Sequence, residues 1–482
     1  PGGYAQGSST SAPTPSVVTN GLRNRRIAAR ASRRRARLPN EITVIGAGLA
    51  GSEAAWQAAR LGVRVRLVEM RPEVNTPAHS TSCFAELVCS NSLGADREGT
   101  ASGLLKEELR ALGSIVMRCA DAARVPAGQA LAVDRELFAA GVTEQVQSVP
   151  DIEVVREEAR NIPGDGIVVI ATGPLTSPAL AADIARFLGE EHLYFFDAAA
   201  PIVDGASIDL EAAFWGARYG RGDADYVNCP MDQAEYDAFW QALVSADVAQ
   251  MHEFECMRLF EGCMPVEELA RRGRDTLRFG PAKPVGLVDP RTGRRPYAAV
   301  QLRRENAPGS LFNIVGFQTR LARPEQRRVF RMIPGLARAE FVRYGMMHRN
   351  TYINGPAHLA ATFSLKRAPR VFFAGQITGV EGYLESTASG LVAGINAARM
   401  AKEMEPAIFP GQTAIGALCA HASAPAAGEY QPMNISFGLL PTPAGAVRRA
   451  EKRALQIREA RAALAKFIDE HLHGRSEHEL GR

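Results

Sequence analysis

The pattern of apolar and polar residues changes abruptly at Ile42. From there the chain reads ITVIGAGLAGSEAAWQAARLGVRVRLVEM, with a short apolar run, a glycine-rich turn, a longer amphipathic run and a second apolar run. We interpret these four pieces as a strand, a turn, a helix and a strand. That order predicts a βαβ unit, in which the two strands are parallel.

Two more short apolar runs predict strands of the same sheet. Residues 166–171 are followed by Thr-Gly-Pro, and residues 371–374 are followed by Gly-Gln and a helical pattern rich in small residues, STASGLVAGINAARMA. Strands that end in glycine indicate backbone crowded against a ligand at the carboxyl edge of a parallel sheet. Because the two runs lie about 200 residues apart, we infer one sheet that is interrupted by an insertion.

These elements predict an α/β fold with a doubly wound, Rossmann-like parallel sheet and an α+β insertion domain. The chain has 482 residues, too many for one small core. The insertion is distinguished by its higher content of aromatic and charged residues. We expect a leader over 1–38, the first part of the sheet domain over 39–200, the insertion over 201–334 and the second part of the sheet domain over 335–482.

Residues 446–468 predict a C-terminal helix within that last part. Seven basic and two acidic residues occupy its polar faces. We interpret it as a solvated helix packed on the body of the protein, and contact with RNA is the alternative. Apolar residues recur in it at helical intervals, namely Val447, Ala450, Ala454, Ile457, Leu464 and Ile468.

The net charge of +4 arises in the first 38 residues, which hold eight Arg, no Lys and no acidic residue. The remainder carries 48 basic and 52 acidic residues, so charge does not indicate that the folded body binds nucleic acid. A segment rich in Ser, Ala and Arg has the composition of an organelle transit peptide, and a disordered basic tail is the alternative. The sequence contains no run of about 18 apolar residues, so it predicts no transmembrane helix. We expect a soluble protein of cytoplasmic type, with residues 1–38 as a candidate signal for import into a plastid or mitochondrion.

Gly46, Gly48 and Gly51 form a G-x-G-x-x-G motif between the first predicted strand and its helix. In this context the first glycine permits a tight turn, the second lets a pyrophosphate approach the backbone, and the third lets the helix pack closely on the strand. The helix N-terminal amides then face the phosphates. Glu69 ends the second strand, where a carboxylate can accept hydrogen bonds from an adenosine ribose. The motif predicts a dinucleotide site, and a glycine-rich turn without function is the alternative.

Two of the seven cysteines lie in surroundings that suggest chemistry. Cys89 follows an apolar stretch in CFAELVCSNSLG, and Cys263 stands in the turn FEGCMPVEELA before a predicted helix, whose N-terminus would favour the nucleophilic thiolate. Taken alone, each such cysteine is more often a small buried residue. An odd number of cysteines without CxxC pairs predicts reduced thiols and no metal site. The others are expected to be inert: Cys83, Cys119, Cys229, Cys256 and Cys419.

A basic and polar triplet, His348, Arg349 and Asn350, lies in YGMMHRNTYING. Such a triplet can bind a carboxylate or the edge of an aromatic ring. It can equally be a loop held by its own hydrogen bonds. We keep it as a candidate substrate-binding group.

Many long segments of the sequence, taken in order, resemble the sequences of a single family. They include GAGLAGSEAAWQAARLGVRVRLVEMRP, FAELVCSNSL, FEGCMPVEELARRG, FGPAKPVGL, YGMMHRNTYIN and FFAGQITGVEGYLESTASGLVAGINAAR. In these words the chain resembles the folate- and FAD-dependent tRNA uracil-5-methyltransferases, from about residue 42 to about residue 440. Words of this length are far more specific than the glycine motif alone.

The resemblance implies an FAD-binding sheet of the glutathione-reductase type, with methylenetetrahydrofolate and NAD(P)H as co-substrates and the T-loop uridine of tRNA as the methyl acceptor. It implies that folate stacks against the flavin, and it makes His348, Arg349 and Asn350 candidates for binding folate or substrate. The two functional cysteines of the family fall on Cys89 and Cys263. The implied FAD-binding residues are Gly46, Gly48, Gly51, Glu69, Arg71, Gly173, Gly375, Gln376 and Gly379.

The chemistry of this family explains why two thiols and a flavin are needed. Carbon 5 of uracil is a poor nucleophile until a thiolate adds to carbon 6. The transferred methylene must then gain two electrons, which reduced flavin can supply as hydride. A second group must remove the carbon 5 proton or assist the transfer. We assign the attack on carbon 6 to Cys263 and the assisting role to Cys89.

The chain departs from the family at two places. Gly94 stands where an Arg usually follows SNSL, and the Arg-rich leader is foreign to the bacterial members. Two alternatives stay open. One is the related flavin enzymes that modify wobble uridines, whose long helical C-terminal domain would not fit into the roughly 40 residues after Leu440. The other is a non-catalytic protein that binds FAD and RNA with inert thiols.

Overall fold

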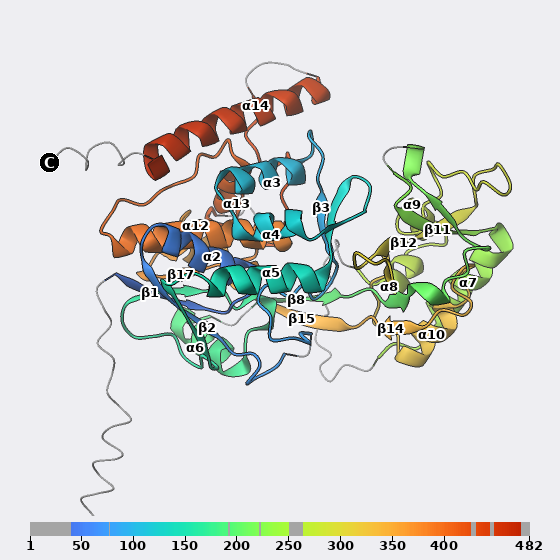
Figure 1. Cartoon of the computed structure of the whole chain (residues 1–482), viewed down its shortest axis with the longest axis horizontal. Helices are drawn as coiled ribbons and strands as arrows, with labels where there is room; N and C mark the ends of the chain where they lie inside the picture. The colour runs from blue at the N-terminus through green and yellow to red at the C-terminus, as the bar shows by residue number, and fades with distance from the viewer. Residues whose placement is uncertain are drawn as a thin grey trace, which may run out of the picture. The chain divides into compact units, whose positions relative to one another are not determined.

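The computed structural model describes residues 40–76, 78–190, 193–220, 223–249, 264–425, 430–443 and 448–473 (Figure 1). Their buried residues form two large hydrophobic cores, one built around each of two six-stranded sheets. No helix in these ranges is both long and apolar enough to cross a membrane.

The first sheet has the strand order β16-β17-β7-β1-β2-β6. All its pairings are parallel except that of β16 with β17. β17 lies beside β7 with Val371 opposite Val168, which confirms the prediction of one sheet formed by strands far apart in the chain. The βαβ unit and both later strands also form as predicted. The strands are β1 (Glu41–Ile45), β2 (Arg64–Glu69), β6 (Ile152–Arg156), β7 (Ile167–Ile170), β16 (Ser364–Leu365) and β17 (Ala368–Phe373).

Helices α2 (Leu49–Arg60) and α12 (Tyr383–Ala401) pack on this sheet and on each other. Their close approach requires small residues. A Cβ atom added at Gly390 would lie 2.2 Å from the carbonyl oxygen of Ala50, and one added at Gly394 would lie 2.4 Å from that of Ala54. The small-residue pattern of α12 therefore reflects helix packing, and it brings the N-termini of α2 and α12 to the carboxyl edge of the sheet.

The remaining helices of the first core are α3 (Ala101–Ala111), α4 (Ile115–Ala122), α5 (Arg135–Gln147), α6 (Pro178–Leu188), α11 (Gly355–His358), α13 (Ala414–Ser423) and α14 (Arg449–Ile468). A small antiparallel sheet joins β3 (Ser92–Ala95), β5 (Ala130–Val133) and β4 (Arg124–Val125). The predicted C-terminal helix is present as α14. It buries Ile457, Ala460 and Leu464 in the core, and Arg461 forms ion pairs with Glu98 and Glu107 near α3.

The second sheet is antiparallel, with the strand order β10-β11-β12-β13-β9-β14. Its last strand, β14, follows Pro334 in the chain. β8 (Leu193–Ala198) and β15 (Met347–Tyr352) pair as an antiparallel ribbon where the chain leaves and returns. The strands are β9 (Ile202–Asp204), β10 (Phe214–Gly216), β11 (Tyr226–Met231), β12 (Ala298–Arg304), β13 (Leu311–Ile314) and β14 (Phe341–Arg343), and the helices are α7 (Gln233–Ser245), α8 (Val266–Arg271), α9 (Thr276–Phe279) and α10 (Arg323–Phe330).

Candidate functional site

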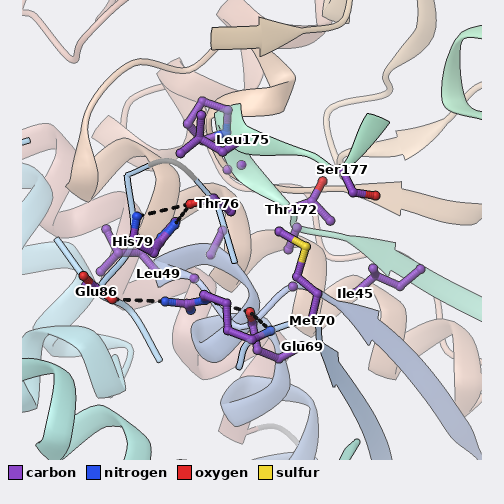
Figure 2. Close-up of a pocket in the computed structure, with 18 of the residues that line it drawn as sticks. Ile45, Leu49, Glu69, Met70, Thr76, His79, Glu86, Thr172, Leu175 and Ser177 are labelled. Atoms are coloured by element: carbon purple, nitrogen blue, oxygen red, sulfur yellow. Dashed lines mark hydrogen bonds and ion pairs between the residues drawn. The ribbon is translucent and has the colours of Figure 1, made fainter. Parts of the chain in front are cut away.

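A cavity lies at the carboxyl edge of the first sheet, where β1, β2, β7 and β17 end (Figure 2). Its volume is about 140 Å³, and we call it the dinucleotide cavity. In a doubly wound sheet, ligands usually bind at the carboxyl ends of the parallel strands. The residues from the sequence prediction that line it are Gly46, Gly48, Glu69, Arg71, Gly173, Gly375 and Gln376.

The three glycines of the motif have three different surroundings. Gly46 has φ +94°, in the region that favours glycine, and a Cβ atom there would lie 2.7 Å from the carbonyl oxygen of Ala171. A Cβ atom at Gly51 would lie 1.8 Å from the carbonyl oxygen of Gly46, so only glycine lets α2 start this close to β1. A Cβ atom at Gly48 would meet no atom within 4 Å, because this position faces open space. A ligand can therefore approach the backbone at Gly48.

Glu69 presents a fixed carboxylate at the end of β2 (Figure 2). Its Oε2 accepts a hydrogen bond from the amide of Ala47 at 2.8 Å, and its Oε1 accepts from Arg71 Nε at 2.8 Å. Burial by itself would raise the pKa of Glu69, but the hydrogen bond and charge of Arg71 outweigh burial and lower that pKa. Arg71 also donates to Glu86 Oε2 at 3.2 Å. The carboxylate of Glu69 is thus held in its ionised form, and Oε2 keeps a lone pair for a ligand hydroxyl.

The end of β17 supplies the opposite side of the dinucleotide cavity. The amide of Gly375, at φ +85°, donates to Ser389 Oγ at 2.7 Å. Gln376 donates to Glu381 at 2.5 Å. Gly379 does not line the cavity, since a Cβ atom at this position would lie 2.3 Å from the ring of Tyr430. Of the predicted glycines in this segment, only Gly375 faces the dinucleotide cavity.

A second cavity of about 380 Å³ adjoins the first, and we call it the Cys89 cavity. Cys89 lines it, as does Asn350, whose side chain is buried. His348 and Arg349 belong to β15, but their side chains lie outside the described part of the chain. Cys263 also lies outside the described residues. The two cavities are continuous because both are lined by Val88, Pro174, Leu175, Gln376, Tyr383 and Ser386.

Tyr383 holds the backbone on which Cys89 stands. Its hydroxyl oxygen accepts hydrogen bonds from the amides of Cys89 at 2.9 Å and Ser90 at 3.2 Å. The Cys89 thiol itself points to the carbonyl oxygen of Ala198, at 3.7 Å. Burial raises the pKa of the Tyr383 hydroxyl, so Tyr383 is neutral. Tyr383, the first residue of α12, lines both cavities and therefore fixes the backbone of Cys89 in the second one.

Three arginines also bind residues 87–91, which we call the Cys89 segment. We call these three arginines the arginine clamp. Arg135, at the start of α5, donates to the carbonyl oxygens of Leu87 and Cys89. Arg303, on β12, donates to Ser90 Oγ at 2.8 Å and to Asn91 Oδ1 at 2.9 Å. Arg343, on β14, donates to the carbonyl oxygen of Val88 at 2.7 Å. Two of the three arginines come from the second sheet, which therefore holds the Cys89 segment directly.

Glu385 and Lys106 add two ionisable groups near the Cys89 cavity. Glu385 lies in the first turn of α12 and lines the cavity. Burial raises the pKa of its carboxyl to about 7. Burial also lowers the pKa of Lys106 to about 8, although Lys106 donates to the carbonyl oxygen of Ala95 at 2.7 Å. Glu385 can therefore gain or lose a proton near neutral pH.

Gly94 also lines the Cys89 cavity, and its backbone explains one departure of this sequence. Its φ is +78°, and a Cβ atom there would lie 3.0 Å from Ser102 Oγ. An arginine would be strained in this backbone conformation. The local chain path of β3 is thus suited to glycine.

Sequence reasoning did not find Tyr383, Glu385 or the arginine clamp. The available signal was weak. Arg303 and Glu305 follow the apolar residues of β12, and charged residues are seldom buried unless they are paired. Glu305 is buried and pairs with Arg135 at 2.5 Å. Only this pairing across the fold shows that the charges serve the Cys89 segment.

The sheet, the glycine turn and the carboxylate at the end of β2 define an α/β protein that binds a dinucleotide. The sequence model of the Glucose inhibited division protein A family matches residues 41–405. The structure of Aquifex aeolicus GidA in its form II crystal aligns with a TM-score of 0.63 and 18% identity over 90% of this chain and 77% of that chain. This likeness shows that the two proteins share the fold.

Much closer relatives share nearly the whole sequence. The methylenetetrahydrofolate-tRNA-(uracil-5-)-methyltransferase TrmFO of Heliobacterium modesticaldum is 58% identical, over 89% of this chain and 98% of that protein. The protein of the same name from Pelotomaculum thermopropionicum is 60% identical over 86% of this chain and 94% of its own length. That of Geobacter sulfurreducens is 58% identical, over 89% and 98%. The chain belongs to the family of methylenetetrahydrofolate-tRNA-(uracil-5-)-methyltransferases.

Proposed function

We propose that this protein methylates carbon 5 of the T-loop uridine of tRNA, with methylenetetrahydrofolate as the carbon donor and NAD(P)H as the reductant. Membership of the family, at 58% identity over almost the entire relative, supports the reaction. The observation that carries it within the structure is the position of Cys89, in a cavity that opens into the dinucleotide cavity. A thiol that acts on a uracil ring beside a bound cofactor needs this arrangement.

The residues of the dinucleotide cavity fit FAD. Open space in front of Gly48 suits a pyrophosphate, and the amides at the N-terminus of α2 provide donors for it. The ionised carboxylate of Glu69 suits the hydroxyls of an adenosine ribose. Gly375 lines the dinucleotide cavity, and Gln376 lines both this cavity and the Cys89 cavity. When bound and reduced by NAD(P)H, the flavin would supply the hydride that brings the transferred carbon to the methyl level.

The Cys89 cavity would receive the uracil and the folate ring. In our assignment the thiolate of Cys263 adds to carbon 6, which makes carbon 5 nucleophilic. Cys89 assists the transfer, and Tyr383 with the arginine clamp keeps its backbone in place. Asn350 offers a buried amide to either ring.

The direct test is to incubate the purified, FAD-loaded protein with unmodified tRNA, with methylenetetrahydrofolate labelled in its methylene group, and with NADPH or NADH. Nucleoside analysis should find labelled 5-methyluridine at the T-loop position, and omission of the nicotinamide should stop its formation. Cys89→Ala should lower the rate at least about 100-fold with FAD still bound, because the thiol acts on substrate. Cys83→Ala is the matched control, since Cys83 is also a partly exposed free cysteine, and it should be active. Failure of the wild-type protein to form 5-methyluridine would refute the proposal.

A further inference from the structure

Asn350 is the most deeply buried side-chain amide in the lining of the Cys89 cavity. The amides of Gln376 and Asn434 line the same cavity and donate to the side chain and the carbonyl oxygen of Glu381, at 2.5 Å and 2.7 Å. Asn350 is only 3% exposed, and within the described ranges of the chain its side chain makes no hydrogen bond. Gln318 also lines the cavity without such a bond to a described residue, but it is only half-buried. A buried amide without a partner is costly, so Asn350 is suited to a ligand.

The ribbon of β8 and β15 places Asn350 near the thiol of Cys89. Asn350 lies on β15 opposite Phe195 of β8, and Ala198 lies three positions further along β8 (Figure 1). The thiol of Cys89 is 3.7 Å from the carbonyl oxygen of Ala198. Three positions along a strand span roughly 10 Å. A single pyrimidine ring can therefore contact the thiol with one edge and the amide with the other.

Strand β15 also lies against the turns that follow β7 and β17. It contacts both the segment Gly173–Leu175 and the segment Gln376–Thr378. Each segment contains residues that line the dinucleotide cavity as well as the Cys89 cavity, namely Pro174, Leu175 and Gln376. This position suits a ring whose new carbon must receive hydride from a flavin.

Under the proposed function, two rings are candidates for this amide. Uracil presents O4 beside N3–H, one acceptor and one donor, which pair with Nδ2 and Oδ1 of an asparagine. The folate ring carries an amino group beside its own N–H, and two neighbouring donors suit a carboxylate better. Glu385 provides a carboxyl group in the lining of the same cavity, where its Oε1 accepts from the amide of Ile435 at 2.9 Å and keeps further acceptor capacity. The chemistry of Asn350 therefore favours the uracil.

We propose that Asn350 binds the O4 and N3–H edge of the target uracil and stabilises the enolate that forms on this ring. The inference rests on the proposed function and deepens it. When the thiolate of Cys263 adds to carbon 6, the S–C bond forms, the electron pair of the C5–C6 double bond shifts to C4–C5, and negative charge develops on O4. Nδ2 of Asn350 then donates to a more negative oxygen, and no proton is transferred. A donor placed where charge develops lowers the barrier.

The first test measures binding of T-loop RNAs that carry uridine or 3-methyluridine at the target position. The methyl group removes the N3–H donor. We expect the FAD-loaded wild-type enzyme, without folate, to bind the uridine RNA at least about tenfold more tightly, since a site that hydrogen-bonds an N–H rejects an analogue without it. Asn350→Ala should remove most of this preference, as in a double-mutant cycle. Asn434→Ala is the matched control and should keep the preference, because its amide is bonded to the carbonyl oxygen of Glu381.

The second test separates a role on the uracil from a role on the folate. Asn350→Asp keeps the size of the side chain but replaces the donor by an acceptor. It should lower kcat at least about 100-fold, the size of effect seen when one donor to a developing oxyanion is removed. The KM for methylenetetrahydrofolate should stay within about threefold of the wild-type value, because the folate ring makes no bond to this amide. Asn350→Asp should also lose the preference for the uridine RNA.

A wild-type enzyme that binds the two RNAs equally would overturn the inference, whichever variants fold. The same preference in the wild type and in both Asn350 variants would overturn it as well. A raised KM for methylenetetrahydrofolate with an unchanged RNA preference would assign Asn350 to the folate ring instead. The binding assay does not need methyl transfer. Loss of the preference in the variants of a protein that forms no 5-methyluridine would therefore support the contact with uracil and refute the proposed function.

Discussion

At Gly48 the missing side chain leaves room for a ligand and is not required by the fold of the protein itself. The residue has φ −71° and ψ −167°, a backbone conformation that any residue adopts, and a Cβ atom there would touch nothing. The neighbouring Gly46 and Gly51 differ, because their missing side chains are required by the protein's own backbone. Substitution at Gly48 should thus affect the cofactor far more than the stability of the sheet.

We expect Gly48→Leu to weaken FAD binding at least about 100-fold, because the new side chain would fill the space in front of the turn. The thermal unfolding temperature of the protein without FAD should stay close to that of the wild type. Flavin fluorescence and absorbance on titration with FAD measure the loss. Gly164→Leu is the control, since Gly164 is exposed and also has open space around it. Normal FAD affinity in Gly48→Leu would contradict the placement of the cofactor.

Glu108 predicts a pH dependence of stability that is independent of catalysis. Its buried carboxyl accepts from the amides of Ala414 at 2.7 Å and Ile415 at 2.9 Å, and burial raises its pKa to about 7. Between pH 4.5 and 7 the folded protein keeps this proton while the unfolded chain releases it. Its contribution to the free energy of unfolding is therefore fully present below pH 4.5 and is lost as the pH rises to about 7.

Glu108→Gln removes this titration. The free energy of unfolding of the variant, relative to the wild type, should increase by roughly 2 to 3 kcal/mol between pH 4.5 and 7, as a pKa shift of this size implies. Urea unfolding of both proteins across this range, at saturating FAD, measures the difference. Parallel curves for the two proteins would show that the carboxyl of Glu108 ionises normally.

At the scale of elements, the Cys89 segment is held by parts of both sheets. Tyr383 of α12 and Arg135 of α5 belong to the first core, whereas Arg303 of β12 and Arg343 of β14 belong to the second sheet. A movement of β12 would therefore displace Ser90 and, with it, the adjacent cysteine. This arrangement makes Arg303 a positioning residue for Cys89.

We expect Arg303→Ala to lower kcat about 10- to 100-fold with a smaller change in the KM for tRNA, because Cys89 would lose its fixed position. FAD affinity should be retained. The rate at which iodoacetamide alkylates Cys89, followed by mass spectrometry, should change as well. Arg304→Ala is the control, since the side chain of Arg304 lies over Trp215, whereas its bond to the Cys89 segment is through the backbone carbonyl, which accepts from Asn91 Nδ2 at 2.9 Å and is kept in the variant. A variant with lower stability but normal kcat and normal alkylation would indicate a purely structural role.

At the scale of the whole molecule, the proposed mechanism requires the insertion, whose strands form the second sheet, to bring Cys263 to the cavity that holds Cys89. The two cysteines are far apart in the sequence, and Cys263 precedes the buried Met264 and helix α8. One uracil can meet both thiols only if both face one cleft, and ligand sites often form at such boundaries between parts of a protein.

We expect a T-loop RNA that contains 5-fluorouracil to trap the wild-type enzyme covalently through Cys263, since fluorine cannot leave as a proton does. Peptide mapping by mass spectrometry identifies the modified residue. Cys263→Ala should prevent the adduct, and both Cys263→Ala and Cys89→Ala should abolish methyl transfer. An adduct on Cys89 would reverse the two roles. Normal methyl transfer by either variant would refute the two-thiol mechanism.

The sequence by itself determined the βαβ unit, the glycine turn, Glu69 and the helix α14. These features depend on neighbouring residues, because strand and helix patterns and the geometry of a tight turn are local. The sequence also indicated that two distant strands share a sheet, since both are apolar runs that end in glycine. Its resemblance to a family predicted Cys89 and Cys263 as the functional cysteines.

Only the tertiary structure decided which residues surround that cysteine. Tyr383, Arg135, Arg303 and Arg343 converge on residues 87–91 from four elements. The sequence likewise did not show that Gly379 packs against Tyr430. The physical reason is that such contacts depend on how two cores pack together, and side chains hundreds of positions apart leave no local pattern when they meet.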